Sequence, residues 1–338
     1  MLTERREAIL RIIVHEYIAG ATPVASRDIA YNYKLNVSPA TVRNDVAYLE
    51  EGGYIMRPHP SAGAIPTDKA YRYYVKIISG DVELPPAEQY QIYELFQGAR
   101  VEFEQWLKLA AALLARFVHN VAVVTPVKAT RCCFKHLDLV ALQDFVGLLI
   151  LVLYEARVRQ RIIFFDKKVT QDNLTMIANK LNSNYTGMAS GEISAGEVEL
   201  SPEERQVTEC VVSMITAEDK QGYGRPYLEG LHLMLSQPEF ASTPSALNLL
   251  EILEGEDWVE ALFQPGLATR GEIKVIIGEE NPDVALQDLS LIVSQYGIPD
   301  RAGGIVGVIG PKRMDYARVI SSVNCFSSLL SKSVARYI

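Results

Sequence analysis

The sequence predicts an α+β protein of several domains, with a winged helix-turn-helix at its N-terminal end. At 338 residues the chain is longer than one ordinary domain. Three short helical segments and a proline- and glycine-rich extended segment occupy the first 78 residues. Beyond them, strands, helices and strands again follow one another, which is typical of an α+β domain with a segment inserted in its middle.

The first two helices are predicted from their apolar spacing and their capping residues. Thr3 is an N-cap candidate, and Gly20 is expected to stop the first helix. Between them the apolar positions recur at helical spacing: Ile9, Ile12, Ile13 and Tyr17. After the TPVA turn, Ser26 is placed to cap a short second helix that carries Ile29, Ala30 and Tyr33.

The third helix has the clearest boundaries. Ser38 is a good N-cap, and Pro39 occupies the first helical position, where its missing N–H costs nothing. Gly52 and Gly53 supply the stop after Glu51. A helix from Ser38 to about Glu51 is therefore expected, directly after the second helix, as in a helix-turn-helix.

A two-stranded wing is expected after this helix. Residues 54–58 would pair with 64–66 around the turn HPSAG. Thr67 and Asp68 would then cap a linking helix, DKAYRYYVKIIS. The proline pair in VELPPAEQ indicates a linker, so we set the end of the first domain at residue 78.

The remaining elements follow from periodicity and apolar runs. Helical sequence covers 88–118. Strands are expected at 121–127, 134–143, 145–154, 157–165, 273–278 and 304–309. Helices are expected at 171–184, 201–217, 227–236, 244–254 and from Lys312 onward. The apolar run 145–154 is about ten residues long, roughly half of what a membrane-spanning helix needs, so it predicts a buried strand.

The net charge of −8 is unevenly distributed along the chain. Residues 1–78 hold ten basic and eight acidic side chains, a net charge of +2, which leaves 23 basic and 33 acidic residues, a net of −10, for the rest. Because acidic residues repel phosphate, any contact with DNA must come from the first 78 residues. A charge of +2 predicts weak binding by one copy, so two copies are expected to act together.

The third helix has the residue types that read the major groove. Val42, Val46 and Leu49 form one face, which is expected to be buried. The opposite face consists of Ala40, Arg43, Asn44 and Ala47. The alanines allow close approach of the backbone, while Arg43 can bind guanine O6 and N7 and Asn44 can bind adenine N6 and N7. The alternative is an ordinary solvated helix face, which the preceding helix and following wing disfavour.

Further contacts are expected around this helix. Thr41 lies at its margin, where it can reach a phosphate or a thymine methyl group, and Arg27 follows Ser26 at a helix N-terminus that can bind phosphate. The simpler alternative is that Ser26 only caps its helix and that the wing histidine, His59, is a passive surface group. The complete set of predicted DNA contacts is Ser26, Arg27, Ser38, Ala40, Thr41, Arg43, Asn44, Arg57, His59 and Ser61.

Catalytic, metal and cofactor chemistry are not predicted. The four cysteines form no CxxC pair and have no histidine at metal-ligand spacing, so we expect buried thiols. Gly304, Gly307 and Gly310 do not form a GxGxxG sequence, and Pro311 precedes Lys312, so a phosphate-binding loop is excluded. The N-terminal sequence has no apolar signal core, and a cytoplasmic protein without a membrane partner is expected.

Three segments identify a family resemblance. The run PVASRDIAYNYKLNVSPATVRNDVAYLEEGGYIMRPHPSAGAIPTDKAYRYYV resembles the N-terminal region of the bacterial heat-inducible transcription repressor HrcA family. IGEENP (277–282) and GGIVGVIGPKRMDYARVI (303–320) resemble that family's other signature segments. The chain departs from the family pattern at Ala64, where a basic wing residue is usual, and at Lys312, where threonine is common.

The resemblance implies a homodimeric repressor of chaperone operons that binds an inverted-repeat operator, called CIRCE, and loses activity on heat stress. It also implies dependence on the chaperonin GroEL. The implied domains are a winged helix (1–78), a linker (79–100), a GAF-like α/β domain (101–165 and 227–338) and an inserted dimerisation segment (166–226). No cofactor is implied.

Two other functions are kept as alternatives. The chain could be a winged-helix regulator whose GAF-like domain senses a small molecule, because such domains often hold ligands. It could also be an enzyme fused to a DNA-binding arm, which the missing catalytic constellation disfavours.

Overall fold

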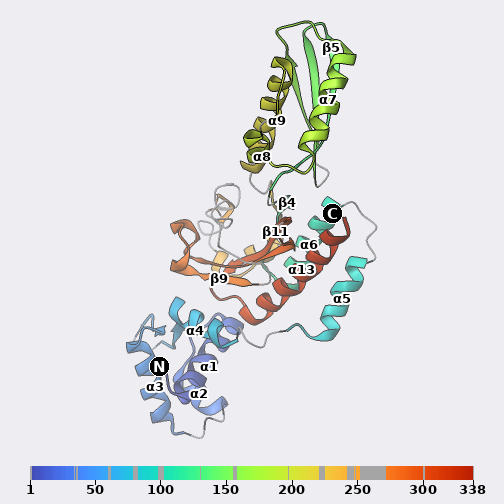
Figure 1. Ribbon diagram of the computed structural model, residues 1–338. Coiled ribbons are helices and arrows are strands. Elements are labelled where there is room, and N and C mark those ends of the chain that lie inside the picture. The colour runs from blue at the N-terminus through green and yellow to red at the C-terminus, as the bar shows by residue number, and fades with distance from the viewer. Residues whose placement is uncertain are drawn as a thin grey trace. The chain divides into compact units, whose positions relative to one another are not determined.

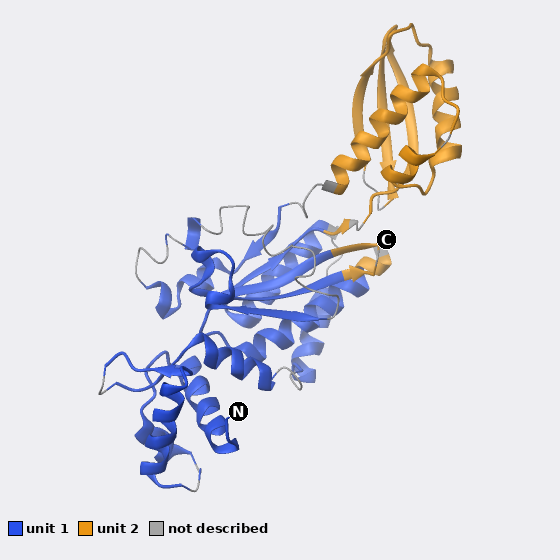
Figure 2. Cartoon of the chain, turned by 60° about the vertical axis from the view of Figure 1, so that its left-hand side comes forward, with its two compact units in different colours: residues 1–126, 225–296, 304–333 blue, residues 127–224, 297–303, 334–338 orange. Residues whose placement is uncertain are grey.

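The chain divides into two compact units, shown in different colours in Figure 2. One unit is made of residues 1–126, 225–296 and 304–333, and the other of 127–224, 297–303 and 334–338. The computed structural model describes residues 2–33, 35, 37–59, 62–78, 83–97, 103–129, 131–154, 158–196, 198–220, 225–241, 247, 249–251, 272–299 and 301–337.

The first unit begins with the predicted winged helix (Figure 1). Its elements are α1 (Glu4–Gly20), α2 (Ser26–Asn32), α3 (Pro39–Glu51), β1 (Ile55–Met56), β2 (Ile65–Pro66) and α4 (Asp68–Ile78). The strands pair antiparallel, with Ile55 opposite Pro66. The apolar faces of the three helices meet in a core that includes Ile9, Ile13, Ile29, Val42, Val46 and Leu49. The winged helix-turn-helix prediction is confirmed.

Two of the predicted helix N-caps, Thr3 and Ser38, are confirmed. The Thr3 side chain accepts a hydrogen bond from the Arg6 N–H, and Ser38 Oγ accepts one from the Thr41 N–H at 3.2 Å. Ser26 differs from the expectation, because it is the first residue of α2 and Ala25 occupies the cap position, with no side-chain cap bond. A serine before an apolar helix can occupy either position, and the backbone at Ala25 decides between them.

The wing is held close to the rest of this domain at Gly63. A side chain there would approach the backbone of Pro23 and Val24 to 2.6 Å, so only glycine fits. The neighbouring Ala64 forms a two-way backbone bridge with Val24. Thr67 Oγ1 donates to the carbonyl oxygens of Gly53 and Tyr54, which ties the base of the wing to the end of α3.

An antiparallel sheet, whose strands differ in length, and the helices packed on it form the rest of the first unit. Its strand order is β8 (Tyr227–Glu229), β3 (Val121–Val124), β11 (Ala302–Pro311), β10 (Leu289–Ile298) and β9 (Ile273–Ile277). The short strand β4 (Lys128–Ala129) pairs with Ala302 and Gly303 at the start of β11, and these four residues belong to the second unit. The helices α5 (Pro86–Gln97), α6 (Phe103–Val118) and α13 (Tyr316–Tyr337) complete the first unit. α6 and α13 lie along one face (Figure 1), and Ser327 of α13 bonds to Ser294 and Gln295 of β10.

Several elements of this unit differ from the sequence predictions. The expected helix at 227–236 begins as strand β8, and only Leu231–Leu235 is helical, as α10. Strand β10 was not predicted. Nearly every one of its residues is buried, so its sequence lacks the alternation of apolar and polar residues that marks a half-exposed strand. Most of the helix predicted at 244–254 lies outside the described residues.

The second unit is a three-stranded antiparallel sheet with helices on one face. Its strands, β5 (Phe134–Gln143), β6 (Val146–Leu153) and β7 (Val158–Phe164), lie in sequence order. Helices α7 (Gln171–Tyr185), α8 (Ser190–Ala195) and α9 (Pro202–Lys220) share a core with them that includes Leu139, Leu151, Leu181 and Val211. The apolar run 145–154 is β6, and no helix among the described residues is long and apolar enough to cross a membrane.

The limits of the inserted segment therefore differ from the sequence expectation. Strands at 134–165, which we assigned to the GAF-like domain, pair with one another and pack on α7–α9. The insertion interrupts the chain between β3 and β8, which are neighbours in the central sheet. Alternating apolar residues predict a strand but do not say which sheet the strand joins, so the sequence placed the boundary at 166 instead of 127.

Candidate nucleic-acid interface

Helix α3 presents the predicted recognition face to solvent. Val42, Val46 and Leu49 are buried, whereas Ala40, Arg43, Asn44 and Ala47 are exposed. Arg43 and Asn44 are neighbours at the middle of this face, flanked by the two alanines. The face therefore has both the low profile and the paired hydrogen-bonding groups that contact with base edges requires.

The orientation of α3 is fixed by an ion-pair cluster that the sequence analysis did not identify. Asp45 lies on the buried side of α3, with 3% of its side chain exposed, and Arg5 Nε donates to its Oδ2 at 2.6 Å. Arg6 Nε donates to the other carboxylate oxygen at 3.0 Å. Because Asp45 directly follows Arg43 and Asn44 in the chain, this cluster holds these two residues in place relative to α1.

The charges of this cluster set the protonation of Asp45. The hydrogen bond from Arg5, aided by Arg6, holds the pKa of Asp45 below its usual value, although burial acts in the opposite direction. The signal that could have revealed the cluster is the position of Asp45 among Val42, Val46 and Leu49. A carboxylate on the buried face of a helix needs a basic partner.

We expect Asp45→Asn to destabilise the fold by about 1–3 kcal/mol at neutral pH, because two arginines lose a charged acceptor. The folded pKa of Asp45 is lowered, so its contribution is complete above the unfolded value, near 3.8, and is lost as the pH falls through the folded value. Denaturant unfolding of the full chain across this range should show the two proteins converging in acid. Asp28→Asn, at an exposed site on α2, is the control. A stability gap that is constant with pH would contradict this role.

Two exposed aromatic side chains, Tyr31 of α2 and Tyr48 of α3, were also missed. The guanidinium of Arg6 lies over the Tyr48 ring, 3.5 Å from its centroid, and that of Arg27 lies 5.6 Å from the centroid of Tyr31. Tyr31 is 70% exposed. These stacked pairs place two basic groups and two flat rings on the surface of the helix-turn-helix.

The wing residues that the sequence analysis proposed as DNA contacts differ in their surroundings. Arg57 Nε lies 3.4 Å from Glu50 Oε2, so the side chain is directed toward the end of α3. His59 is exposed, and Ser61 lies outside the described residues. Ala64 occupies a wing position where a basic residue is usual in the family that the sequence resembles, and it is 1% exposed. A DNA contact from the side chain of Ala64 is therefore excluded.

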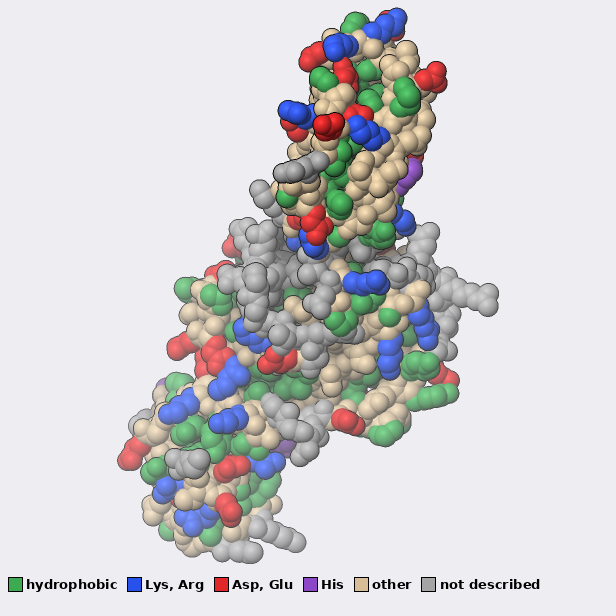
Figure 3. Space-filling view, viewed as in Figure 1, with side chains coloured by type: hydrophobic (Ala, Val, Ile, Leu, Met, Phe, Trp, Pro, Cys, Tyr) green, Lys and Arg blue, Asp and Glu red, His purple; other side chains and the backbone are tan. Residues whose placement is uncertain are grey.

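The remaining predicted contacts are placed around α3. Thr41 is half-buried and its hydroxyl lies 2.9 Å from that of Ser38, so both belong to the helix cap. Arg27 is exposed at the start of α2 and Ser26 is half-buried beside it. Basic and acidic side chains are interspersed over this domain in Figure 3, in keeping with its small net charge.

The described residues line a cavity but form no cluster of metal-ligating side chains. They contain no group of three or more His, Cys, Asp or Glu side chains able to hold a metal ion. A cavity of about 770 Å³ is lined in part by Asp68, Glu239, Lys312 and Arg313. These charges are paired with one another, Asp68 with Lys312 and Glu239 with Arg313.

Comparison with known families identifies both parts of the chain. Residues 1–77 match the family described as winged helix-turn-helix transcription repressor, HrcA DNA-binding. Residues 104–320 match the HrcA protein C terminal domain. The chain belongs to the HrcA family. It is thus a winged-helix DNA-binding regulator, and DNA is the partner of its N-terminal domain.

Relatives in this family match the chain over nearly its whole length. A heat-inducible transcription repressor HrcA of Dehalococcoides mccartyi is 44% identical over 99% of this chain and 96% of its own. One of Herpetosiphon aurantiacus is 40% identical over 98% and 94%, respectively. A solved structure of a hypothetical protein superposes over 100% of both chains with a TM-score of 0.63 at 23% identity, and so shares the fold.

Proposed function

We propose that this HrcA-family protein represses heat-shock chaperone operons by binding an inverted-repeat, CIRCE-type operator as a homodimer. The observation that carries the proposal is the exposed face of α3, where Arg43 and Asn44 lie between two alanines in a winged helix. Its curated relatives are named heat-inducible transcription repressors. The place of action is the cytoplasm, where a bacterial chromosome is accessible.

An uncovered apolar sheet face in the second unit supports the homodimer. The helices of this unit cover one face of its sheet, toward which Ile163 of β7 points. The alternate residues of β7 point away from the helices, and Val158, Ile162 and Phe164 are 55%, 53% and 69% exposed. Val140 of β5 lies on the same side, opposite Leu148 of β6, which pairs in turn with Ile162.

A second copy of the chain is the occupant that fits this face. A large exposed apolar patch marks an interaction surface, and an inverted repeat requires two recognition helices related by two-fold symmetry. A self-complementary contact between two such faces supplies that symmetry. We therefore propose that residues 127–224 are the inserted dimerisation segment and that the central sheet with α6 and α13 is the GAF-like domain.

The resemblance to the HrcA family also implies that the repressor depends on the chaperonin GroEL. An apolar sheet face that is covered only in the dimer is exposed whenever the dimer dissociates or unfolds, and a chaperonin binds such surfaces. GroEL would keep the repressor folded, and its diversion to unfolded proteins during heat stress would release the operator.

The test is operator binding by the purified protein with and without GroEL and ATP. We expect specific binding of an inverted-repeat duplex over a scrambled duplex at fixed salt, and a larger active fraction after incubation with GroEL and ATP. An equal affinity for both duplexes would refute the repressor proposal. An active fraction that GroEL leaves unchanged would refute the chaperonin step alone.

A further inference from the structure

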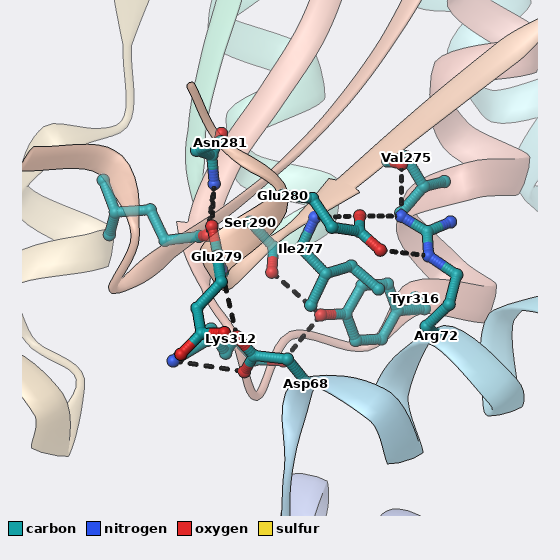
Figure 4. A network of polar contacts seen from close by, with 12 residues as sticks. Asp68, Arg72, Val275, Ile277, Glu279, Glu280, Asn281, Ser290, Lys312 and Tyr316 are labelled. Atoms are coloured by element: carbon teal, nitrogen blue, oxygen red, sulfur yellow. Dashed lines mark hydrogen bonds and ion pairs between the residues drawn. The ribbon is translucent and has the colours of Figure 1, made fainter. Parts of the chain in front are cut away.

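Helix α4 of the winged helix is bonded to backbone atoms of the central domain, by which we mean the sheet β8-β3-β11-β10-β9 with helices α6 and α13 (Figure 4). Asp68, its first residue, accepts a hydrogen bond from the Glu279 N–H at 3.1 Å and forms an ion pair with Lys312 at 3.1 Å. One turn later, Arg72 donates to the carbonyl oxygen of Val275 at 2.7 Å. Backbone atoms cannot rotate away as side chains do, so these bonds fix the direction of α4.

The partners of Arg72 are themselves held in place. Arg72 binds the Glu280 carboxylate through two nitrogens, with Nε to Oε1 at 2.6 Å. The same carboxylate accepts the Ile277 N–H at 2.9 Å. Glu280 therefore bridges α4 and the end of β9, in a bidentate geometry that sets the angle of the arginine as well as its distance.

Gly278 permits this contact. Its φ is +51°, and a side chain there would approach Asp68 Oδ2 to 1.9 Å. The positive φ favours glycine, and a side chain there would displace the Asp68 carboxylate from this contact. The segment IGEENP is thus shaped around the first residue of α4.

An aromatic pair fills the centre of the same contact. Tyr71 of α4 and Tyr316 of α13 are 2% and 0% exposed, and their ring centroids are 5.7 Å apart. The Tyr316 hydroxyl lies 2.9 Å from Ser290 Oγ. Nearby, Arg313 donates to the carbonyl oxygen of Ile18 in α1 at 2.7 Å. A buried aromatic centre with a polar rim is the anatomy of a stable interface, not of a flexible tether.

The contact leaves the recognition face uncovered. Ala40, Arg43, Asn44 and Ala47 are all exposed in the unit that contains this interface. The interface therefore does not block DNA binding by occluding α3. Its effect is to set the direction in which α3 is presented by the central domain.

We propose that the interface formed by Asp68, Arg72, Gly278, Glu280 and Lys312 narrows the range of half-site spacings that the repressor accepts. This inference rests on the proposed binding of an inverted repeat by a homodimer. Because the winged helix and the domain that carries it are held as one piece within the first unit, a dimer has fewer joints about which its two recognition helices can move, so fewer spacings satisfy both. A tether would accept several spacings.

The physical basis is effective concentration. Binding of the second half-site is intramolecular and can strengthen binding by about 10²–10⁴-fold, but only if the geometry allows both contacts. Successive half-sites face the same side of the duplex at intervals of about 10 bp, so a change of about 5 bp places one half-site on the opposite side. A dimer whose winged helices cannot turn on their own domains is more strongly affected at that spacing than one whose winged helices are tethered.

The experiment compares the full-length protein with the double variant Arg72→Ala, Lys312→Ala. Affinities are measured at fixed salt for one half-site and for inverted repeats with the natural spacer or with spacers changed by about 1, 2 and 5 bp. The control variant, Lys76→Ala with Lys332→Ala, removes the same charge from exposed sites on α4 and α13. Glu280→Gln is a milder second variant that serves if the first does not fold, and thermal melting checks each protein.

We expect the wild type and the control variant to accept a narrow range of spacers. The interface variant should bind the single half-site normally, bind the natural repeat more weakly and lose about tenfold less affinity when the spacer is altered. Equally narrow profiles for wild type and variant, a wild type that tolerates every spacer, or tighter binding of the natural repeat by the variant would each overturn the inference. A wild type that binds the repeat no better than the half-site would refute the homodimer proposal as well.

Discussion

Replacement of Arg43 by alanine is expected to remove most of the preference for operator over random DNA. A bidentate arginine–guanine contact contributes about 1–3 kcal/mol of discrimination, or roughly a factor of 10 to 10² per half-site, and a dimer makes the contact twice. Arg43 is exposed at the centre of the recognition face, so no described contact has to be broken before it reaches a base. The measurement is a titration of operator and scrambled duplexes at one salt concentration.

The control separates reading of sequence from loss of charge. Arg11→Ala removes the same charge from an exposed position on α1, away from the recognition face. It should weaken binding to both duplexes similarly, because phosphate attraction is independent of sequence. If Arg43→Ala retains the operator-to-random ratio of the wild type, Arg43 is not a base reader.

Phe164→Lys is expected to dissociate the proposed homodimer. Phe164 is 69% exposed on the apolar sheet face of the second unit, and a lysine at each copy of a two-fold contact would place unpaired charges in an apolar interface. Loss of the second recognition helix would lower operator affinity by about 10²–10⁴-fold. Sedimentation gives the oligomeric state, and titration of the operator gives the affinity.

Met176→Lys supplies the matched control, because Met176 is 64% exposed on α7, on the helical side of the same unit. This variant should remain dimeric and bind the operator normally. A Phe164→Lys protein that sediments as a dimer would show that the sheet face is not the contact. A monomer with undiminished operator affinity would instead separate dimerisation from DNA binding.

The recognition helix was predictable because its determinants are local. Ser38, Pro39 and Gly52 lie within or beside α3, and their effects depend on the backbone within a few residues. The outward positions of Arg43 and Asn44 follow from helical periodicity once the buried face is known. The wing was predictable from turn residues for the same reason.

The supports of that helix were not predictable, because they join distant residues. Asp45 is paired with Arg5 and Arg6, about forty residues earlier, and Asp68 with the backbone at Glu279, 211 residues later. The same limit applied to strands 134–165, whose partners only the folded sheet reveals. Periodicity states which face of an element is apolar but not what covers it.

The sequence by itself determined that α3 presents Arg43 and Asn44 to solvent, since capping and periodicity act within a few residues. Tertiary structure alone decided how that helix is held against α1, by Asp45, and how α4 of the same winged helix is held against the central domain, by Asp68 and Arg72. The reason is geometric. A charged or small residue has many possible partners along a chain of 338 residues, and only packing brings one of them within bonding distance.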